Sequence, residues 1–431
     1  MKVTLSFDKT GADIVLPDRL SVDVLESRFA QALDDPKPAL EAALRDPIGC
    51  PPLEEMARGK RSAAISVCDI TRPAPNRTVL PFVIAALERA GIAPSEIRIL
   101  IATGLHREAT DAELDEIVGS EILARHPVDS HRAKQDDEQS YLGETSTGTP
   151  VYNDRRFVEA DLHITLGFIE PHLMAGFSGG RKLISIGLAG EKTIKRLHSP
   201  LFMRDPLAVE GSFPDNPLHR ELIEIAGMVR HDFMVDVALT RDRGIAAVFA
   251  GDPVAAHARG VDFVRESTLA RRNEAADAVI TTSGGYPLDL TFYQAVKGIT
   301  AASHIVKPGG TILLAAACSE GVGSPEFTDL VRRGLHWEAL LDELAAAPVT
   351  VTVDQWQAEK LAMVACQVDL SFCVPGVPEQ DRSHLWGPAF ADPQQAVDDL
   401  AARLPAGSSV VVIPEGPYVF SQLQPEPVLV A

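Results

Sequence analysis

The chain alternates short apolar runs with segments of helical periodicity. Apolar runs cover Ala63–Asp69, Ile97–Thr103 and Asp161–Phe168, and the first two are followed within a few residues by a proline or a glycine. Each run is too short for a helix and is typical of a buried strand. Between the runs, Val79–Ala90 and Thr110–Gly119 have helical spacing. Strands that alternate with helices predict parallel βαβ units, in which ligands bind at the carboxyl ends of the strands.

The same pattern predicts two domains. At the start of the chain we expect a strand or hairpin and then a helix over Asp23–Leu44, before a proline-containing loop. A polar, charged stretch at 265–276 interrupts the pattern. Beyond it, we expect buried strands at Ala278–Thr282 and Thr311–Cys318, with a helix over Phe292–His304 between them.

The predicted fold class is therefore α/β, with two domains whose parallel or mixed sheets are flanked by helices and whose active site lies in the interdomain cleft. We expect an N-terminal cofactor-binding and catalytic domain over 1–270 and a second α/β domain over 275–400 that closes over the cleft. The last segment, 401–431, holds a strand-like run at 408–414 and fits either domain.

Composition adds limits on the class of protein. The chain has 431 residues, of which 45% are apolar and 23% charged, an ordinary globular composition. It holds no uninterrupted apolar stretch of about 18 residues, so a membrane span is not expected. The N-terminus alternates polar and apolar residues and lacks the apolar core of a signal peptide. Five cysteines, none spaced as C-x-x-C, are read as reduced thiols of a cytoplasmic protein.

Charge narrows the choice of partners. Lys and Arg total 40 against 60 Asp and Glu, a formal charge of −20. Such a surface repels polyphosphate, so nucleic acids and anionic membranes are disfavoured as partners. A small anionic substrate still fits if a local basic pocket exists, and the acidic surface suits a monomer and a dimer equally.

Several familiar motifs are absent. The segment GFSGGRK, Gly176–Lys182, has an arginine where a P-loop needs glycine before its lysine, and no Ser or Thr follows that lysine. No G-x-G-x-x-G follows a predicted strand. Metalloprotease H-E-x-x-H and paired-cysteine zinc patterns are also missing.

Two loops at predicted strand ends carry reactive side chains. In CDITRP, Arg72 offers a planar fork for a carboxylate, and Asp69 is suited to orient a hydroxyl or a ribose. In ATGLHR, His106 follows a strand and a glycine turn, where an imidazole is a natural general base. For the first loop, the alternative is that Asp69 caps a helix and Arg72 is solvated. For the second loop, the alternative is that His106 is structural or exposed.

The densest cluster is GFIEPHLMAGFSGGRKLISIGLAG, in which His172 follows a predicted strand. Small residues after it let the backbone approach a ligand, and two basic residues follow the glycines. Together they predict a cradle for an anion or cofactor. The alternative is a mobile surface turn, against which the apolar run that follows, Leu183–Leu188, argues. The cradle residues are Ser178, Gly179, Gly180, Arg181 and Lys182.

Two further groups come from predicted helices. His198 ends a helix that begins near Gly190, just before a proline, and imidazole suits nickel, copper, zinc or iron. A helix-end histidine is also a common partner of the helix dipole. Further on, Tyr293, Gln294 and Lys297 lie within one helical turn. Tyr293 and Lys297 share a face that could point into an interdomain cleft, or Tyr293 could pack in the core.

The order and spacing of CDITRP, TGLHR, EPH, SGGRK, RLHSP and YQAVK make the sequence resemble the nickel-dependent lactate racemase family. The resemblance extends over essentially the whole chain, and the segment from EPH to RLHSP is its most specific part. It implies a nickel-pincer nucleotide, a pyridinium-3,5-bisthiocarboxylic acid mononucleotide that holds nickel through carbon and sulfur.

The resemblance also implies residue roles. Lys182 matches the lysine that tethers the cofactor through a thioamide, and His198 matches the one protein ligand to nickel. Asp69 and the basic residues of the glycine loop would hold the nucleotide. His106 and His172 match the pair of general acids and bases. The remaining matches bind substrate, with Arg72 and Lys297 positioning the carboxylate and Tyr293, Gln294 and Trp356 nearby.

The activity implied is racemisation or epimerisation of a small 2-hydroxy acid, lactate or a relative, by hydride transfer through a 2-oxo acid. Two other readings stay open. One is a binding or sensor protein that holds hydroxy or oxo acids without turnover. The other is a conventional metal-dependent lyase or hydrolase with His106, His172 and His198 on one metal, which predicts that Lys182 is dispensable.

Overall fold

The computed structural model describes residues 1–26, 30–346 and 351–423. They form two compact units, each with a six-stranded sheet flanked by helices, which confirms the predicted α/β class. The glycine-loop unit comprises Phe29–Leu197 and Pro206–Ser267. The terminal unit comprises the described parts of Met1–Arg28, His198–Asp205 and Thr268–Ala431.

The sheet of the glycine-loop unit has the strand order β13-β12-β9-β4-β5-β6. Its strands are parallel except for β13, which pairs antiparallel with β12. The central strands are buried along their whole length, as expected for a parallel sheet covered on both faces. The bounds are β4 Ala63–Cys68, β5 Ile97–Ala102, β6 Val128–Ser130, β9 His163–Phe168, β12 Phe233–Leu239 and β13 Ile245–Gly251.

Helices and two small hairpins complete this unit. Its helix α4 begins with a capping box, in which the Thr110 side chain accepts from the Glu113 backbone and the Glu113 side chain accepts in return. The hairpins are β7 Gln139–Glu144 with β8 Pro150–Asp154, and β10 Pro171–His172 with β11 Gly176–Phe177. The helices are α1 Lys37–Arg45, α2 Leu53–Ala57, α3 Asn76–Arg89, α4 Asp111–Val118, α5 Ser120–Arg125, α6 Arg155–Val158, α7 Arg181–Ser185, α8 Glu191–Leu197, α10 Pro217–Val229 and α11 Pro253–Thr268, whose last residue falls in the terminal unit.

The sheet of the terminal unit is parallel throughout, in the order β18-β17-β16-β15-β19-β3. Separate apolar cores cover its two faces. A β1–β2 hairpin and a parallel β14–β20 pair lie outside the sheet. The bounds are β1 Lys2–Leu5, β2 Ala12–Val15, β3 Ser21–Val24, β14 Leu269–Arg272, β15 Ala276–Thr282, β16 Val306–Ala315, β17 Asp369–Cys373, β18 Ala389–Phe390, β19 Ser409–Ile413 and β20 Phe420–Leu423.

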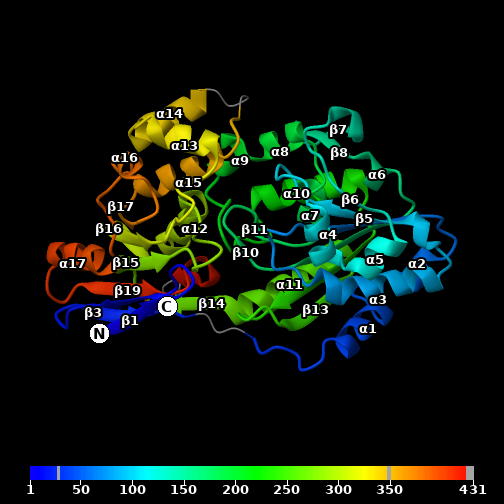
Figure 1. The fold of residues 1–431 in the computed structure, drawn as a ribbon, viewed down its shortest axis with the longest axis horizontal. Helices are drawn as coiled ribbons and strands as arrows, with labels where there is room; N and C mark the ends of the chain where they lie inside the picture. Colours follow the sequence, from blue (N-terminus) through cyan, green and yellow to red (C-terminus); the bar gives the residue numbers. More distant parts are fainter. Residues whose placement is uncertain (27–29, 347–350, 424–431) are drawn as a thin grey trace, which may run out of the picture. The chain divides into compact units, whose positions relative to one another are not determined.

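Strands from the early and the late part of the sequence meet in the terminal unit. Figure 1 shows the blue strands β1 and β3 beside the red β19, with which β3 is paired. The helices of this unit are α9 Pro200–Met203, α12 Phe292–Ser303, α13 Pro325–Arg332, α14 Trp337–Ala346, α15 Gln355–Ala365, α16 Glu379–Arg382 and α17 Pro393–Arg403. No helix in the described residues is long and apolar enough to cross a lipid bilayer.

The structure differs from the sequence-based expectation in three places. The predicted helix over Asp23–Leu44 is wrong at its start, because Ser21–Val24 is a strand and residues 30–36 are not helical, whereas 27–29 lie outside the described residues. The helix begins at Lys37, where Pro36 and Pro38 are tolerated in a first turn. The 408–414 run belongs to the terminal unit, where β19 is an interior strand. The start of the chain and His198–Asp205 also belong to that unit rather than to a domain over 1–270.

Candidate functional site

The reactive loops of the glycine-loop unit gather at one edge of its sheet. Strand β4 pairs in parallel with β5 on one side and with β9 on the other, so the carboxyl ends of all three meet there. Asp69 directly follows β4, His106 follows β5, and the hairpin with His172 and the glycine loop follow β9. The topology thus brings together three clusters that are far apart in sequence.

Asp69 and His106 form a pair. The Asp69 carboxylate lies 2.7 Å from His106 Nδ1 and accepts a hydrogen bond from the Thr71 hydroxyl, also at 2.7 Å. Burial by itself would raise the pKa of Asp69, but the hydrogen bonds and charges around it, above all those of His106, hold that pKa below its usual value. The carboxylate therefore stays ionised and fixes the Nδ1–H tautomer of His106, whose side chain is half exposed.

The sequence suggests that Asp69 orients a hydroxyl or a ribose, and the resemblance implies that it holds the nucleotide; in the structure its carboxylate contacts His106 and Thr71. Arg72 lies half-buried on the same loop, close enough for its positive charge to help lower the Asp69 pKa. The sequence places Asp69 and His106 each at the end of a predicted strand. It does not show that the two strands are neighbours in the sheet, which is what brings the two side chains together.

The glycine loop is held in a conformation that favours glycine. Gly179 and Gly180 have φ angles of 89° and 44°. A Cβ on Gly179 would lie 2.3 Å from Asp236 Oδ2, and the same oxygen accepts a hydrogen bond of 2.7 Å from the Gly180 backbone. Burial in β12 raises the pKa of Asp236 to about 7. This carboxyl group, which no sequence motif marks, anchors the loop to the sheet.

Arg181 is placed differently from the expected cofactor cradle. Its side chain is 3% exposed and donates hydrogen bonds inward, to the carbonyls of residues 175 and 177–179. It also lies 2.5 Å from His257 Nε2. Burial lowers its pKa to about 9, although Asp236 opposes this effect. Ser178 likewise turns inward, with its hydroxyl donating to the Phe168 carbonyl. These buried side chains therefore stabilise the glycine loop through hydrogen bonds on its inner side.

The side chains of Lys182 and His172 contact each other. Lys182 Nζ lies 2.7 Å from His172 Nε2. On the other side of the ring, Nδ1 accepts hydrogen bonds from the backbone amides of Met174 and Ala175, at 3.4 and 3.2 Å. The imidazole is thus fixed by its own loop and directed at the lysine amine, which brings two of the predicted site residues together.

The terminal unit brings together a second set of predicted residues. The ring of His198 packs against Trp356 in a tilted arrangement, with centroids 4.4 Å apart and an interplanar angle of 43°, and Trp356 Nε1 donates to the Tyr293 hydroxyl at 3.2 Å. On α12, Lys297 Nζ donates to Gln294 Oε1 at 2.6 Å. Lys297 therefore pairs with Gln294, about one turn away on the same helix.

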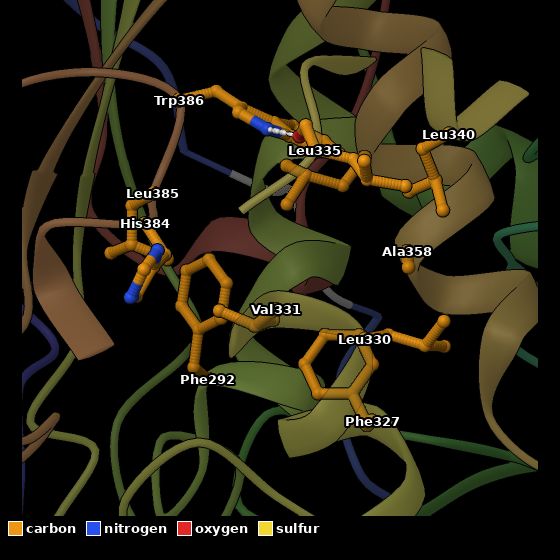
Figure 2. Close-up of a pocket in the computed structure, with 11 residues that line it drawn as sticks. Phe292, Phe327, Leu330, Val331, Leu335, Leu340, Ala358, His384, Leu385 and Trp386 are labelled. Atoms are coloured by element: carbon orange, nitrogen blue, oxygen red, sulfur yellow. Dashed lines mark hydrogen bonds between the residues drawn. The ribbon is translucent and has the colours of Figure 1, made fainter. Parts of the chain in front are cut away.

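A small cavity in this unit is lined by none of these residues. Figure 2 shows it lined by apolar side chains of α12, α13 and α15, with Trp386 Nε1 donating to the Leu335 carbonyl at its rim. The space inside is about 20 Å³, enough for roughly one water molecule. It belongs to the apolar core, and we assign it no ligand.

In the described residues of the two units, no group of three or more His, Cys, Asp or Glu side chains is placed to hold a metal.

The fold is α/β, and one edge of its sheet carries paired acid–base side chains. Comparison with known proteins places the chain among the isomerases, in one particular family. Family models for the lactate racemase N-terminal domain and C-terminal domain match residues 7–211 and 271–420. The chain therefore belongs to the lactate racemase family. It is 36% identical to the lactate racemase of Lactiplantibacillus plantarum over 379 residues, 88% of this chain and 89% of the relative.

A second relative and two solved structures agree with this assignment. The lactate racemase of Thermoanaerobacterium thermosaccharolyticum is 33% identical over 365 residues, 84% of this chain and 85% of the relative. The solved apoprotein from that organism matches with a TM-score of 0.91 and 30% identity, over 98% of this chain and all of that one. A Thermotoga maritima protein shares the fold alone, with a TM-score of 0.64 and 17% identity over 86% of this chain and 96% of that one.

Proposed function

We propose that the chain racemises or epimerises a small 2-hydroxy acid, lactate or a close relative, by hydride transfer with a nickel-pincer nucleotide. One observation carries the proposal: a single sheet edge presents an imidazole paired with a carboxylate, His106 with Asp69, and an imidazole paired with an amine, His172 with Lys182. Two bases that differ in their partners suit a reaction in which each enantiomer presents its hydroxyl to a different base.

The residues present fit the proposed cofactor in their chemistry. Lys182 supplies a primary amine, half-buried at the end of the glycine loop, for a covalent tether. His198 supplies an imidazole, a ligand that suits nickel. Its ring packs against Trp356 at an interplanar angle of 43°, and a metal would bind the lone pair that lies in the imidazole plane. The loop of Gly179 and Gly180, fixed from beneath by Arg181 and Asp236, would lie against the nucleotide.

When bound, the nickel cofactor supplies an acceptor and donor of hydride for C2 of the substrate. This matters because removal of the C2 hydrogen as a proton would leave a carbanion beside a carboxylate, which stabilises it poorly. The protein is then required only to move the hydroxyl proton and to hold the 2-oxo acid. The planar carbonyl must offer its opposite face before hydride returns to C2.

His106 takes the hydroxyl proton at its Nε2 atom in one direction of the reaction. The ionised Asp69 holds the proton on Nδ1 and stabilises the imidazolium that forms. His172 serves the other enantiomer through its Nε2 atom, with Nδ1 fixed by backbone amides. Each base is oriented by a partner on the side of the ring away from its reacting nitrogen.

The remaining residues bind the substrate. Arg72 and Lys297 are cations suited to the substrate carboxylate, and Arg72 presents the planar fork. Tyr293, Gln294 and Trp356 supply polar and aromatic surface in the terminal unit. The proposed reaction therefore draws on residues of both units. We also propose a cytoplasmic location, because the five cysteines are free thiols, which suits a reducing compartment.

A screen of 2-hydroxy acids tests this proposal. Protein loaded in a host that makes the cofactor is incubated with single enantiomers, and the products are separated by chiral chromatography. We expect at least one small 2-hydroxy acid to reach a racemic or epimeric mixture. The control is His198→Ala from the same host, which is expected to lose both nickel and activity. Loaded, nickel-containing protein that inverts no 2-hydroxy acid would overturn the assignment.

A further inference from the structure

One face of α15 carries three residues that contact the segment 198–205. Trp356, Glu359 and Lys360 are spaced at i, i+3 and i+4, which places them side by side on a helix. Their exposed fractions are 7%, 0% and 5%. The segment they face begins at His198 and includes α9, and it belongs to the same unit as α15.

Each of the three residues contacts a different part of this segment. The Trp356 ring packs against the His198 ring in a tilted arrangement. Lys360 Nζ donates to the Met203 carbonyl at 2.7 Å, at the end of α9. Glu359 Oε1 accepts from Arg204 Nε at 2.5 Å. The same arginine also donates to the Leu341 carbonyl on α14. The segment is therefore tied to α15 at its first residue and near its last.

These contacts are costly for the fold. Burial lowers the pKa of Lys360 to about 8 and raises the pKa of Glu359, even though Arg204 lowers the latter. A buried charged group is expensive to desolvate, and apolar residues of similar volume often give equal or greater stability. An ordinary core helix would be expected to use apolar residues at these positions. The charged residues instead supply the directed bonds that fix the backbone and Arg204 of the segment.

We propose that this face of α15 positions His198 for nickel, with Glu359 and Lys360 as positioning residues that act through the segment 198–205. The proposal rests on the proposed function, in which His198 is the protein ligand to nickel. Residues that orient a metal ligand from outside the coordination sphere often change metal affinity by about 10- to 100-fold when they are replaced. The same kind of effect is expected from bonds that fix the short helix directly after the ligand.

The test compares nickel release from loaded protein carrying Lys360→Met or Lys360→Gln. Methionine keeps the length and removes the donor, whereas glutamine keeps a donor for the Met203 carbonyl. We expect Lys360→Met to lose nickel to a chelator about ten times faster than the wild type, and Lys360→Gln to stay within about threefold. The adduct mass on Lys182 should be unchanged in both, because that residue belongs to the other unit.

Stability is measured in parallel to separate positioning from folding. Lys360→Met removes a buried charge but also takes the donor away from the Met203 carbonyl, so its melting temperature should fall no further than that of the core variant Leu361→Ala. Leu361→Ala, on the same helix but packed in the apolar core, is the destabilised control and should release nickel at the wild-type rate. Glu359→Leu is a second variant, expected to accelerate release if Lys360→Met proves unfolded.

The outcomes are distinct. Wild-type protein without adduct or nickel, from a host that loads a lactate racemase, would refute the proposed function itself. Wild-type protein that holds nickel, together with folded Lys360→Met and Glu359→Leu that release it at the same rate, would overturn the positioning role alone. Faster release from Leu361→Ala, in proportion to its lost stability, would also overturn it.

Discussion

Lys182→Ala is expected to yield a folded chain that carries no covalent adduct and has racemase activity at the background rate. Alanine has no amine to form a tether, and the chemistry of the reaction resides in the cofactor. The change removes the contact with His172 Nε2 but leaves the loop supports, Arg181 and Asp236, in place. The melting temperature should therefore stay within about 4 °C of the wild type. Intact mass spectrometry and chiral analysis of the products check both expectations.

Lys192→Ala is the matched control for this variant. Lys192 is an exposed lysine of α8 that pairs with Asp136 at 2.7 Å. An exposed ion pair contributes little to stability, so stability, adduct and activity should all remain. An adduct that persists in Lys182→Ala, or activity that survives the change, would show that Lys182 is not the tether.

His106→Gln is expected to lower kcat by about 10²- to 10⁴-fold, the usual contribution of a positioned acid–base group. Glutamine has no nitrogen that takes a proton near neutral pH, so the substrate hydroxyl loses its base. The two enantiomers of a simple 2-hydroxy acid have equal free energy, so kcat/KM must fall by the same factor in both directions. Kinetics with each pure enantiomer, on protein shown to contain adduct and nickel, measure the effect.

Asp69→Asn tests the partner of that base. Asparagine keeps the shape of the side chain but loses the charge that stabilises the imidazolium and the hydrogen bond that selects the Nδ1–H tautomer. We expect a loss of kcat comparable to that of His106→Gln, and little further loss when the two changes are combined, because the residues act as a unit. Fully additive losses, or an unchanged kcat in Asp69→Asn, would contradict the paired role.

Local pattern is enough to predict the strands that carry the site. The runs Ala63–Asp69 and Ile97–Thr103 correspond to β4 and β5 within one residue of the predicted end, so hydrophobic periodicity alone places Asp69 and His106 on loops at strand ends. Their hydrogen bond could not be predicted, because it depends on β4 and β5 being neighbours in the sheet. Strand order is a long-range property that short-range periodicity does not contain.

The glycine loop shows a second limit. A basic residue after two glycines suggests an anion site, and Lys182 fits that expectation of a reactive, half-buried group. Arg181, one residue earlier, points into the core instead, because the loop carbonyls it bonds converge beneath the turn. The clue is Asp236, a charged residue within the apolar strand β12, since a buried charge needs partners.

The terminal unit shows a third limit, in the assignment of segments to domains. His198–Asp205 lies in sequence among residues of the glycine-loop unit, yet it packs on α15 through buried charges. Glu359 and Lys360 resemble a solvated pair in the sequence and are in fact buried. Helical periodicity of apolar residues identifies one buried face. A helix that is covered on more than one side also buries residues outside that apolar face, so the pattern does not reveal them.

The fate of the C2 hydrogen tests the central claim most directly. Loaded protein is incubated in ordinary water with one enantiomer of a 2-hydroxy acid that carries deuterium at C2, and the opposite enantiomer is isolated and its mass measured. Hydride transfer within the closed cycle predicts that the product keeps its deuterium. Replacement of that deuterium by solvent hydrogen as fast as racemisation proceeds would show proton removal through a carbanion and would contradict the account.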